Sequence, residues 1–232
     1  INLNYKAHPD IRFFARMCRD LALEASVPVA LNQDHGAEYE HAMRAIQAGF
    51  TAVMADRSTL PFEENIAKVS EIVKVAHACG VTVEAELGHV GYSDKDDMKE
   101  RALTVPSEAK EYVERTGVDC LAVAIGTVHG VYKGTPHIDF DLLHELRDTV
   151  NVPLVLHGGS GTGEDNLARA CREGICKINI GTDVMQAGRD AVRTFREISS
   201  TPYAFAESNR RVQPKSPPSP RPPIEVGPVY GG

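Results

Sequence analysis

The chain has 232 residues, of which 42% are hydrophobic and 25% are charged, and its formal net charge at pH 7 is −7. These values are ordinary for a globular protein, and the length allows one large α/β domain or two small ones. The acidic balance, without a basic cluster on any predicted helix face, argues against a nucleic-acid partner. The apolar runs are too short to span a membrane and no secretory signal is recognisable. We therefore expect no membrane partner and a cytoplasmic location.

Five cysteines are present, an odd number, and none of them forms a C-x-x-C pair. A disulfide framework or a zinc knuckle would need paired cysteines. We therefore expect free thiols in a reducing cytoplasm. The five residues are Cys18, Cys79, Cys120, Cys171 and Cys176.

Six short apolar runs predict β-strands, and each is followed by glycine or polar residues. The clearest run contains Leu154, Val155 and Leu156, which are consecutive, with no alternating polar residue, as in a strand buried on both faces. Residues 1–9 carry no strong pattern. The predicted strands are residues 27–31, 51–55, 81–85, 118–125, 152–156 and 176–180.

Seven segments between and around these strands predict helices. Gly49, Gly80, Gly117 and Gly174 stand directly after four of them, where glycine is favoured at a helix end. Strict alternation of strands and helices implies parallel strands joined by right-handed crossovers. The predicted helices are residues 10–25, 38–48, 61–79, 106–116, 139–149, 164–173 and 183–198.

Polar residues follow the carboxyl end of every predicted strand. This pattern is typical of a (β/α)8 barrel, whereas a doubly wound sheet gathers function at one switch point. We therefore predict an α/β fold of the TIM-barrel class over residues 1–200, although six strands are two fewer than eight. Residues 201–232 are predicted to be a disordered or foreign tail, because five prolines lie within 216–223 and no helical or strand period is present.

Three histidines, His35, His129 and His157, each lie just past a predicted strand and precede a glycine. A barrel would bring them to one mouth, where three imidazoles could bind a catalytic zinc ion and leave one position open. The alternative is that each is a hydrogen-bonded structural residue. The histidines that we expect to be solvated are His8, His41, His77, His89, His137 and His144.

Three carboxylates also follow predicted strands. Asp34 could act as a general acid or base beside a cation, or could instead fix the tautomer of a histidine. Asp56 and Glu86 could hold a second cation through their oxygen atoms. Helix capping or ion pairing is the alternative for these two residues.

Two glycine turns predict a phosphate site. Gly158, Gly159 and Ser160 connect a strand to a helix, so backbone N–H groups could close on a phosphate at the helix N-terminus. A second such element, residues 177–182, lies at the last predicted strand, as in barrels whose last two βα loops bind phosphate. Plain turn chemistry is the alternative.

Five sequence strings occur in a fixed order: V-P-V-A-L-N-Q-D-H-G, V-E-A-E-L-G, L-A-V-A-I-G-T-V-H-G, V-P-L-V-L-H-G-G-S-G and K-I-N-I-G-T. Together, over about residues 10–198, they resemble the zinc-dependent class II ketose-bisphosphate aldolases, in particular the tagatose- and fructose-bisphosphate branch. The resemblance implies a barrel enzyme of glycolysis and related carbohydrate metabolism, a homodimer or homotetramer. Such an enzyme reversibly cleaves a ketose 1,6-bisphosphate to dihydroxyacetone phosphate and glyceraldehyde 3-phosphate, with zinc stabilising the enediolate.

The resemblance also implies roles for individual residues. His35, His129 and His157 would bind Zn²⁺, and Asp34 would exchange a proton with the C4 hydroxyl. The residues that would hold dihydroxyacetone phosphate are Gly130, Gly158, Gly159, Ser160, Asn179, Ile180, Gly181 and Thr182.

Other positions match the family less closely, and we expect its first two βα units to be missing. Asp56 and Glu86 match the second cation position, monovalent or divalent. Arg57 replaces the usual glycine, which argues against a tightly held monovalent ion, or for an arginine that reaches a substrate phosphate. Asp94 stands where a glutamate usually moves the proton on the C3 side, and Asn32 stands where a histidine is common.

Two other functions stay open. A non-catalytic barrel could keep the metal and phosphate motifs, and a metal-free phosphate-binding barrel could use the histidines as acid/base groups. A metal-dependent barrel hydrolase is disfavoured, because no H-x-H pair follows the first predicted strand. Fructose and tagatose bisphosphates differ only at C4, and the motifs do not separate them.

Overall fold

A computed structural model describes residues 1–4, 10–90, 103–130, 132, 134 and 136–199. The chain divides into two compact units, Ile1–Met185 and Gln186–Gly232. All the strands that are described belong to the first unit. Of the second unit, the structure describes residues 186–199, which are helical. The predicted tail, residues 201–232, lies outside the described residues, so its prediction is not tested.

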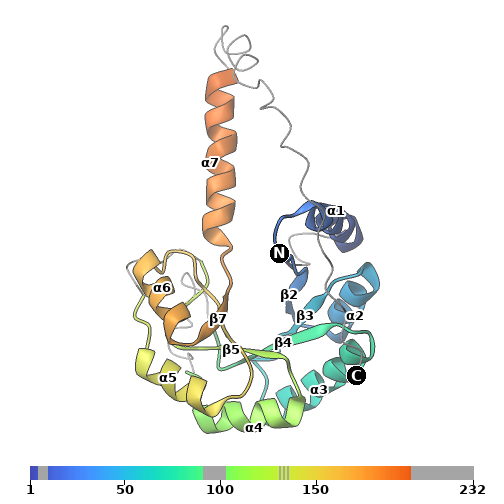
Figure 1. Cartoon of the computed structure of the whole chain (residues 1–232), viewed down its shortest axis with the longest axis vertical. Helices are drawn as coiled ribbons and strands as arrows, with labels where there is room; N and C mark the ends of the chain where they lie inside the picture. Colours follow the sequence, from blue (N-terminus) through green and yellow to red (C-terminus); the bar gives the residue numbers. More distant parts are fainter. Residues whose placement is uncertain (5–9, 91–102, 131, 133, 135, 200–232) are drawn as a thin grey trace, which may run out of the picture. The chain divides into compact units, whose positions relative to one another are not determined.

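Parallel strands form one sheet whose spatial order equals their order in the chain, with helices between them (Figure 1). The predicted alternation and the parallel pairing are therefore confirmed. The strands are β1 (Asn2–Asn4), β2 (Asn32–Gly36), β3 (Ala52–Ala55), β4 (Thr82–Leu87), β5 (Cys120–Val123), β6 (Leu154–Leu156) and β7 (Ile175–Ile178).

The sheet is curled, as one contact across its inner side demonstrates. His35 belongs to β2 and His157 follows β6, yet His35 Nε2 lies 3.1 Å from His157 Nδ1. Neighbouring strands lie about 4.8 Å apart, so four steps across a flat sheet would separate these residues by about 19 Å. A curled, parallel α/β sheet is consistent with the predicted TIM-barrel class.

The predicted count of six strands is wrong, because the described residues contain seven. The additional strand, β1, has a single apolar residue, Leu3, and so lacks a recognisable pattern. It is held by parallel pairing to β2, with Asn2 opposite Asn32. The predicted absence of two βα units stays a prediction.

The predicted strand at residues 27–31 is also wrong, since pairing begins at Asn32. The apolar run that suggested it includes Val27, whose residue surface is 64% exposed, and Pro28, which has no N–H to donate. The strand is instead the polar sequence N-Q-D-H-G, which pairs with β3. The sequence pattern missed this strand because its residues are polar and form no apolar run.

The helices lie close to their predicted bounds. Gly49 and Gly117 end two of them in the left-handed conformation, at φ of 87° and 70°. Asp10 and Asp139 cap two N-termini by accepting hydrogen bonds from the amides of Phe13 and Leu142. The helices are α1 (Ile11–Glu24), α2 (Tyr39–Ala48), α3 (Phe62–Ala78), α4 (Pro106–Thr116), α5 (Phe140–Thr149), α6 (Glu164–Glu173) and α7 (Thr182–Ser199).

Two further predictions concern the chain as a whole. All five cysteines are free thiols, as predicted. Among the described helices, none is both long and apolar enough to cross a membrane.

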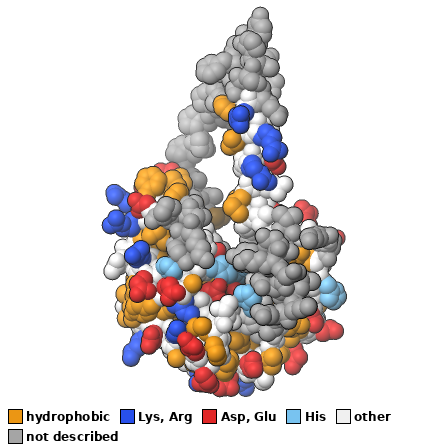
Figure 2. All heavy atoms as spheres, turned by 180° about the vertical axis from the view of Figure 1, so that it is seen from behind, with side chains coloured by type: hydrophobic (Ala, Val, Ile, Leu, Met, Phe, Trp, Pro, Cys, Tyr) orange, Lys and Arg blue, Asp and Glu red, His pale blue; other side chains and the backbone are white. Residues whose placement is uncertain are grey.

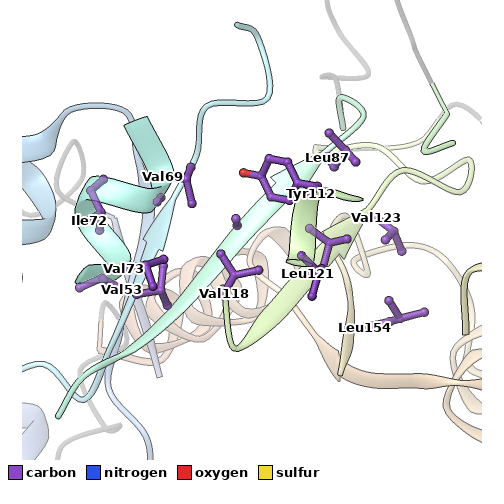
Figure 3. Close-up of a cluster of buried hydrophobic side chains, with 14 of the residues drawn as sticks. Val53, Val69, Ile72, Val73, Leu87, Tyr112, Val118, Leu121, Val123 and Leu154 are labelled. Atoms are coloured by element: carbon purple, nitrogen blue, oxygen red, sulfur yellow. The ribbon is translucent and has the colours of Figure 1, made fainter. Parts of the chain in front are cut away.

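The two faces of the sheet differ in chemistry. Outward-facing strand residues such as Val53, Leu121 and Leu154 join one buried hydrophobic cluster with side chains of α3 and α4 (Figure 3). The inner face instead carries polar groups such as Glu84 and Lys177, whose side chains meet each other. The outer face therefore supplies the hydrophobic stabilisation, and the inner face is left for chemistry.

Tyr112 connects this core to the inner face. Its ring is fully buried, and its hydroxyl donates to Asn65 Oδ1 at 2.7 Å. Asn65 in turn lies with its Nδ2 3.5 Å from the carbonyl oxygen of Glu86. A hydrogen bond in the core thus supports the end of β4.

We predict that Tyr112→Phe lowers the free energy of unfolding by about 1–3 kcal/mol, because Asn65 Oδ1 loses its buried donor. Urea unfolding followed by circular dichroism measures this change. The pair Tyr112→Phe with Asn65→Leu removes both partners, so its loss should be smaller than the sum of the two single losses. A Tyr112→Phe variant as stable as the unmodified chain would contradict the interpretation.

Candidate metal centre

Backbone geometry in β2 turns two neighbouring side chains toward the same side. Gln33 pairs with Val53 and Gly36 with Ala55, so β2 uses one more residue than β3 over this interval and forms a bulge. Within the bulge, His35 has a φ of 46°, the only positive value at a non-glycine residue among those described. A regular strand would send Asp34 and His35 to opposite faces; the bulge brings both to the inner side.

The three predicted histidines meet at the carboxyl ends of β2, β5 and β6. Their ring centroids lie 4.9 Å apart for His35 and His129, 4.8 Å for His35 and His157, and 5.6 Å for His129 and His157. All three pairs of rings are nearly perpendicular, and His157 is completely buried. One nitrogen from each ring lies within 4.8 Å of the others, so the group could hold a metal ion.

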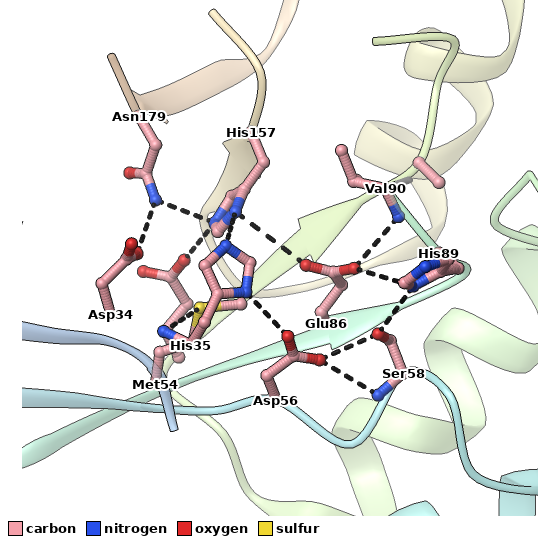
Figure 4. Close-up of polar contacts among 12 residues, drawn as sticks. Asp34, His35, Met54, Asp56, Ser58, Glu86, His89, Val90, His157 and Asn179 are labelled. Atoms are coloured by element: carbon pink, nitrogen blue, oxygen red, sulfur yellow. Dashed lines mark hydrogen bonds and ion pairs between the residues drawn. The ribbon is translucent and has the colours of Figure 1, made fainter. Parts of the chain in front are cut away.

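Carboxylates surround His35 (Figure 4). Asp56 Oδ2 lies 2.7 Å from His35 Nδ1, and its other oxygen accepts hydrogen bonds from the amide and hydroxyl of Ser58. Burial by itself would lower the pKa of His35, but the bond to Asp56 and the nearby Asp34 and Glu86 raise it to about 9. Burial likewise opposes ionisation of Asp56, yet its bonds to His35 and Ser58 hold its pKa below the ordinary value. The site therefore favours a positive charge at His35.

A second group of possible ligands shares His35. Oxygens of Asp56 and Glu86 and a nitrogen of His35 also lie within 4.8 Å of one another. Glu86 is 1% exposed, and burial together with the Asp56 charge raises its pKa. Glu86 Oε1 accepts from the Val90 amide at 3.1 Å, whereas Oε2 has no hydrogen-bond donor among the described residues. A buried carboxylate oxygen without a donor is suited to a cation.

His129 has a different electrostatic environment. Its burial, together with the neighbouring His35 and His157, lowers its pKa to about 3. A neutral imidazole has a lone pair on one nitrogen, which is the form that binds metals. The following Gly130 has a φ of 96°, which favours glycine at this turn.

Asp34 lies beside Asn179, and it is not the carboxylate that is bonded to the imidazole of His35. Asp34 Oδ1 is 3.4 Å from Asn179 Nδ2, and the carboxylate bonded to His35 Nδ1 is Asp56. Asp56 and Ser58 thus hold the ring of His35, and Asp34 faces the end of β7. Asp34 is therefore directed to the inner side of the sheet, and its role as an acid or base stays a prediction.

The two predicted glycine turns meet each other. Gly158 has a φ of 69°, and a Cβ atom there would collide with the backbone of Val128. A Cβ atom on Gly159 would lie 2.6 Å from the Ile178 side chain. Ser160 Oγ accepts hydrogen bonds from the amides of Gly181 and Asp183, both at 3.2 Å, at the start of α7. Close packing therefore requires glycine at both positions and joins the two turns.

The remaining predicted positions differ in outcome. Arg57 is 5% exposed, and its Nη1 donates to the carbonyl oxygens of Gly36 and Asp56, so its proposed effect on a cation or a phosphate stays a prediction. His89, expected to be solvated, lies 3.2 Å from Ser58 Oγ. Asp94 lies outside the described residues, so its role stays a prediction.

Two important residues were missed by the sequence predictions. Glu84 accepts from His157 Nε2 at 2.8 Å and is paired with Lys177 at 2.6 Å. Burial alone would raise the pKa of Glu84, but its bonds to His157 and Lys177 hold that pKa below the ordinary value. The available signal was the E-A-E sequence of β4, because alternate residues of a strand point to the same face.

Figure 2 shows histidine and acidic side chains next to each other on one face of the molecule.

Fold and site together define a parallel α/β protein with a candidate metal centre at the carboxyl ends of its strands. A sequence model described as class II fructose-bisphosphate aldolase matches residues 2–216. The chain belongs to the class II fructose-bisphosphate aldolase family. The resemblance read from the motifs is therefore confirmed, and the match extends beyond residues 10–198 at both ends.

Curated relatives and solved structures agree with this assignment. The chain is 48% identical over 172 residues to the fructose-bisphosphate aldolase of Geobacillus stearothermophilus and covers 60% of it, with 74% of this chain aligned. It is 45% identical over 172 residues to the enzyme of Staphylococcus aureus, again covering 60% of that relative and 74% of this chain. The chain therefore spans less than two thirds of these relatives.

Solved structures extend the comparison to the fold. The crystal structure of the YdjI aldolase from Escherichia coli K12 superposes with a TM-score of 0.76 at 38% identity, covering 91% of this chain and 75% of that one. The crystal structure of fructose-bisphosphate aldolase from Campylobacter jejuni superposes with a TM-score of 0.65 at 28% identity, covering 79% of this chain and 61% of that one.

Cys120 provides a test of the charge at the inner face. Its Sγ lies 4.0 Å from Glu84 Oε2, and burial together with that carboxylate raises its pKa to about 12. Since only the thiolate reacts, we predict that Cys120 is alkylated far more slowly at pH 8.5 than the exposed Cys171, and that its rate still rises between pH 9 and pH 11. Peptide mass spectrometry after timed iodoacetamide labelling measures both rates. Equal labelling of the two thiols in the folded chain would contradict the description of Cys120 as a buried thiol beside a carboxylate.

Proposed function

We propose that this chain catalyses metal-dependent aldol cleavage and condensation of a ketose 1,6-bisphosphate, fructose or tagatose. The products of cleavage are dihydroxyacetone phosphate and glyceraldehyde 3-phosphate. The observation that carries the proposal is the convergence of His35, His129 and His157, with ligand atoms within 4.8 Å, beside Asp34 and two glycine turns. Family membership supports the reaction class.

Zinc is the metal that this set of side chains fits best. Three imidazoles with one open position are typical of catalytic zinc sites, and the ionised carboxylates around His35 favour a cation. When bound, zinc stabilises the negative charge that develops on the ketose oxygens as the C3–C4 bond breaks. Oxygens of Asp56 and Glu86, with a nitrogen of His35, form the second group that could hold a cation.

Asp34 is the proposed general base for cleavage. Its carboxylate takes the proton of the C4 hydroxyl, the C4–O bond becomes the aldehyde carbonyl, and the C3–C4 bond breaks. The electron pair of that bond stays with the three-carbon ketone fragment, which then receives a proton at C3. Asp94 is the proposed donor of that proton. In condensation the same steps run in reverse.

The glycine turns would hold the phosphate of the ketone fragment. Gly158, Gly159 and Ser160 lie against residues 179–182, and backbone amides gathered at the start of α7 favour an anion. A phosphate there would take over the amides of Gly181 and Asp183 from Ser160. Binding far from the breaking bond would thereby fix the fragment in position. A homo-oligomer and a cytoplasmic location complete the proposal.

The test combines metal content with cleavage of both bisphosphates. We expect about one zinc ion per chain, loss of activity with a chelator and recovery with added zinc. We further expect His129→Ala to lose zinc binding by calorimetry together with activity. The matched control is His77→Ala, which removes an external histidine that is 2.9 Å from Asp119 and should change neither.

Other outcomes would favour the other functions. Zinc binding without cleavage of either sugar would indicate a non-catalytic chain that keeps its ligands. Cleavage that is unaffected by the chelator would indicate a metal-free reaction. Zinc binding that survives His129→Ala would show that the three histidines are not the metal site.

A further inference from the structure

Glu84 and Lys177 form an ion pair behind His157 that has no role in the chemistry proposed above. Glu84 lies on β4 and Lys177 on β7, and Glu84 Oε2 is 2.6 Å from Lys177 Nζ. Glu84 is 3% exposed, so its charge is withdrawn from water. The other carboxylate oxygen lies 2.8 Å from His157 Nε2. The pair therefore reaches across the inner side of the sheet to a candidate metal ligand.

This contact determines which nitrogen of His157 carries hydrogen. An ionised carboxylate only accepts hydrogen bonds, so Nε2 must donate to Glu84 and Nδ1 must keep its lone pair. Nδ1 is the nitrogen that faces the other histidines, 3.1 Å from His35 Nε2. Carboxylates placed behind metal-binding histidines have this effect in general. Glu84 thus directs the lone pair of His157 into the candidate metal centre.

Lys177 orients a second side chain by the same logic. Its ammonium lies 2.7 Å from Asn179 Oδ1 and can only donate, so the amide oxygen faces the lysine. The amide nitrogen then faces Asp34 and His157, at 3.4 and 2.9 Å. His157 Nε2 cannot both donate to Glu84 and accept from Asn179, and the charge-assisted bond to Glu84 is the stronger. The Asn179 N–H groups are therefore left for Asp34 or for an oxygen of the substrate.

We propose that Glu84 and Lys177 are positioning residues, Glu84 setting the tautomer of His157 and Lys177 setting the orientation of the Asn179 amide. The kinetic part of this inference rests on the proposed function. The tautomer part does not, since it concerns the metal-free chain. Three variants separate the two roles.

In Glu84→Gln, the lysine still requires an oxygen acceptor, so the new amide turns its oxygen to Lys177 and its NH₂ to His157. We therefore expect the tautomer of His157 to reverse, with hydrogen on Nδ1. Lys177→Met keeps the carboxylate and should keep hydrogen on Nε2. The combined variant, Glu84→Gln with Lys177→Met, has no ammonium that needs an oxygen acceptor. The introduced amide can therefore face either way, and a mixture of His157 tautomers should result. Nitrogen-15 NMR of the imidazoles in the chelator-treated chain measures all three, with His157→Gln to assign the signal.

Zinc affinity and kinetics give independent readouts. We expect the zinc dissociation constant to rise about 10- to 100-fold in Glu84→Gln and to change little in Lys177→Met. In Lys177→Met we expect a higher KM for the bisphosphate, because the Asn179 amide is free to rotate. Glu173→Gln is the matched control, since Glu173 contacts His144 at 2.9 Å outside the site. It should leave the His157 tautomer and the zinc affinity unchanged.

An unchanged His157 tautomer in Glu84→Gln would overturn the inference, and so would a tautomer change of equal size in Glu173→Gln. If Glu84→Gln does not fold, Lys177→Met is compared with the combined variant. The inference predicts one His157 tautomer in Lys177→Met and a mixture in the combined variant, and NMR distinguishes these results. The combined variant leaves no uncompensated buried charge. A chain that cleaves neither sugar but shows the predicted reversal would contradict the proposed function alone. An active chain with the tautomer unmoved would contradict this inference alone.

Discussion

Two carboxylates of one strand, Glu84 and Glu86, are buried on the inner face of β4, and a buried charge requires a partner. Glu84 is paired with Lys177 of β7 and bonded to His157 after β6. These partners come from strands that would lie far from β4 in a flat sheet, so the sheet must curl to bring them together. The buried charge of Glu84 is therefore compensated only in a sheet that is curled.

The two carboxylates have opposite electrostatic outcomes. Glu84 has cationic and N–H partners that favour its charge, whereas Glu86 has Asp56 nearby and one oxygen without a donor among the described residues. The difference separates a carboxylate that supports a ligand from one that is suited to be a ligand. Strand β4 thus supplies a candidate metal ligand, Glu86, and a residue that contacts a candidate ligand, Glu84, because alternate residues of a strand share a face.

Local patterns in the sequence predicted the helices, their glycine ends and five of the strands, since these depend on neighbouring residues. They failed at β1 and β2, whose residues are mostly polar, so that neither segment has the apolar run that indicates the other strands. The three histidines were predictable because each follows a strand in the same way. The E-A-E sequence indicated that Glu84 shares a face with Glu86, but its contact with Lys177, 93 positions away, could not be predicted from a local pattern. No local pattern indicated that Arg57 would be buried against the carbonyl oxygens of Gly36 and Asp56.

The bulge in β2 argues that the site, rather than the fold, determines this piece of backbone. A left-handed conformation at a residue with a side chain costs about 1–2 kcal/mol, and a regular strand would have avoided it. A regular strand would also have placed either Asp34 or His35 outside, among the apolar side chains packed under the helices. The bonds of His35 to Asp56 and His157 offset the cost of the left-handed conformation. They can form only because the side chain of His35 turns inward together with that of Asp34. Strain at His35 is thus the structural consequence of using two consecutive residues in one site.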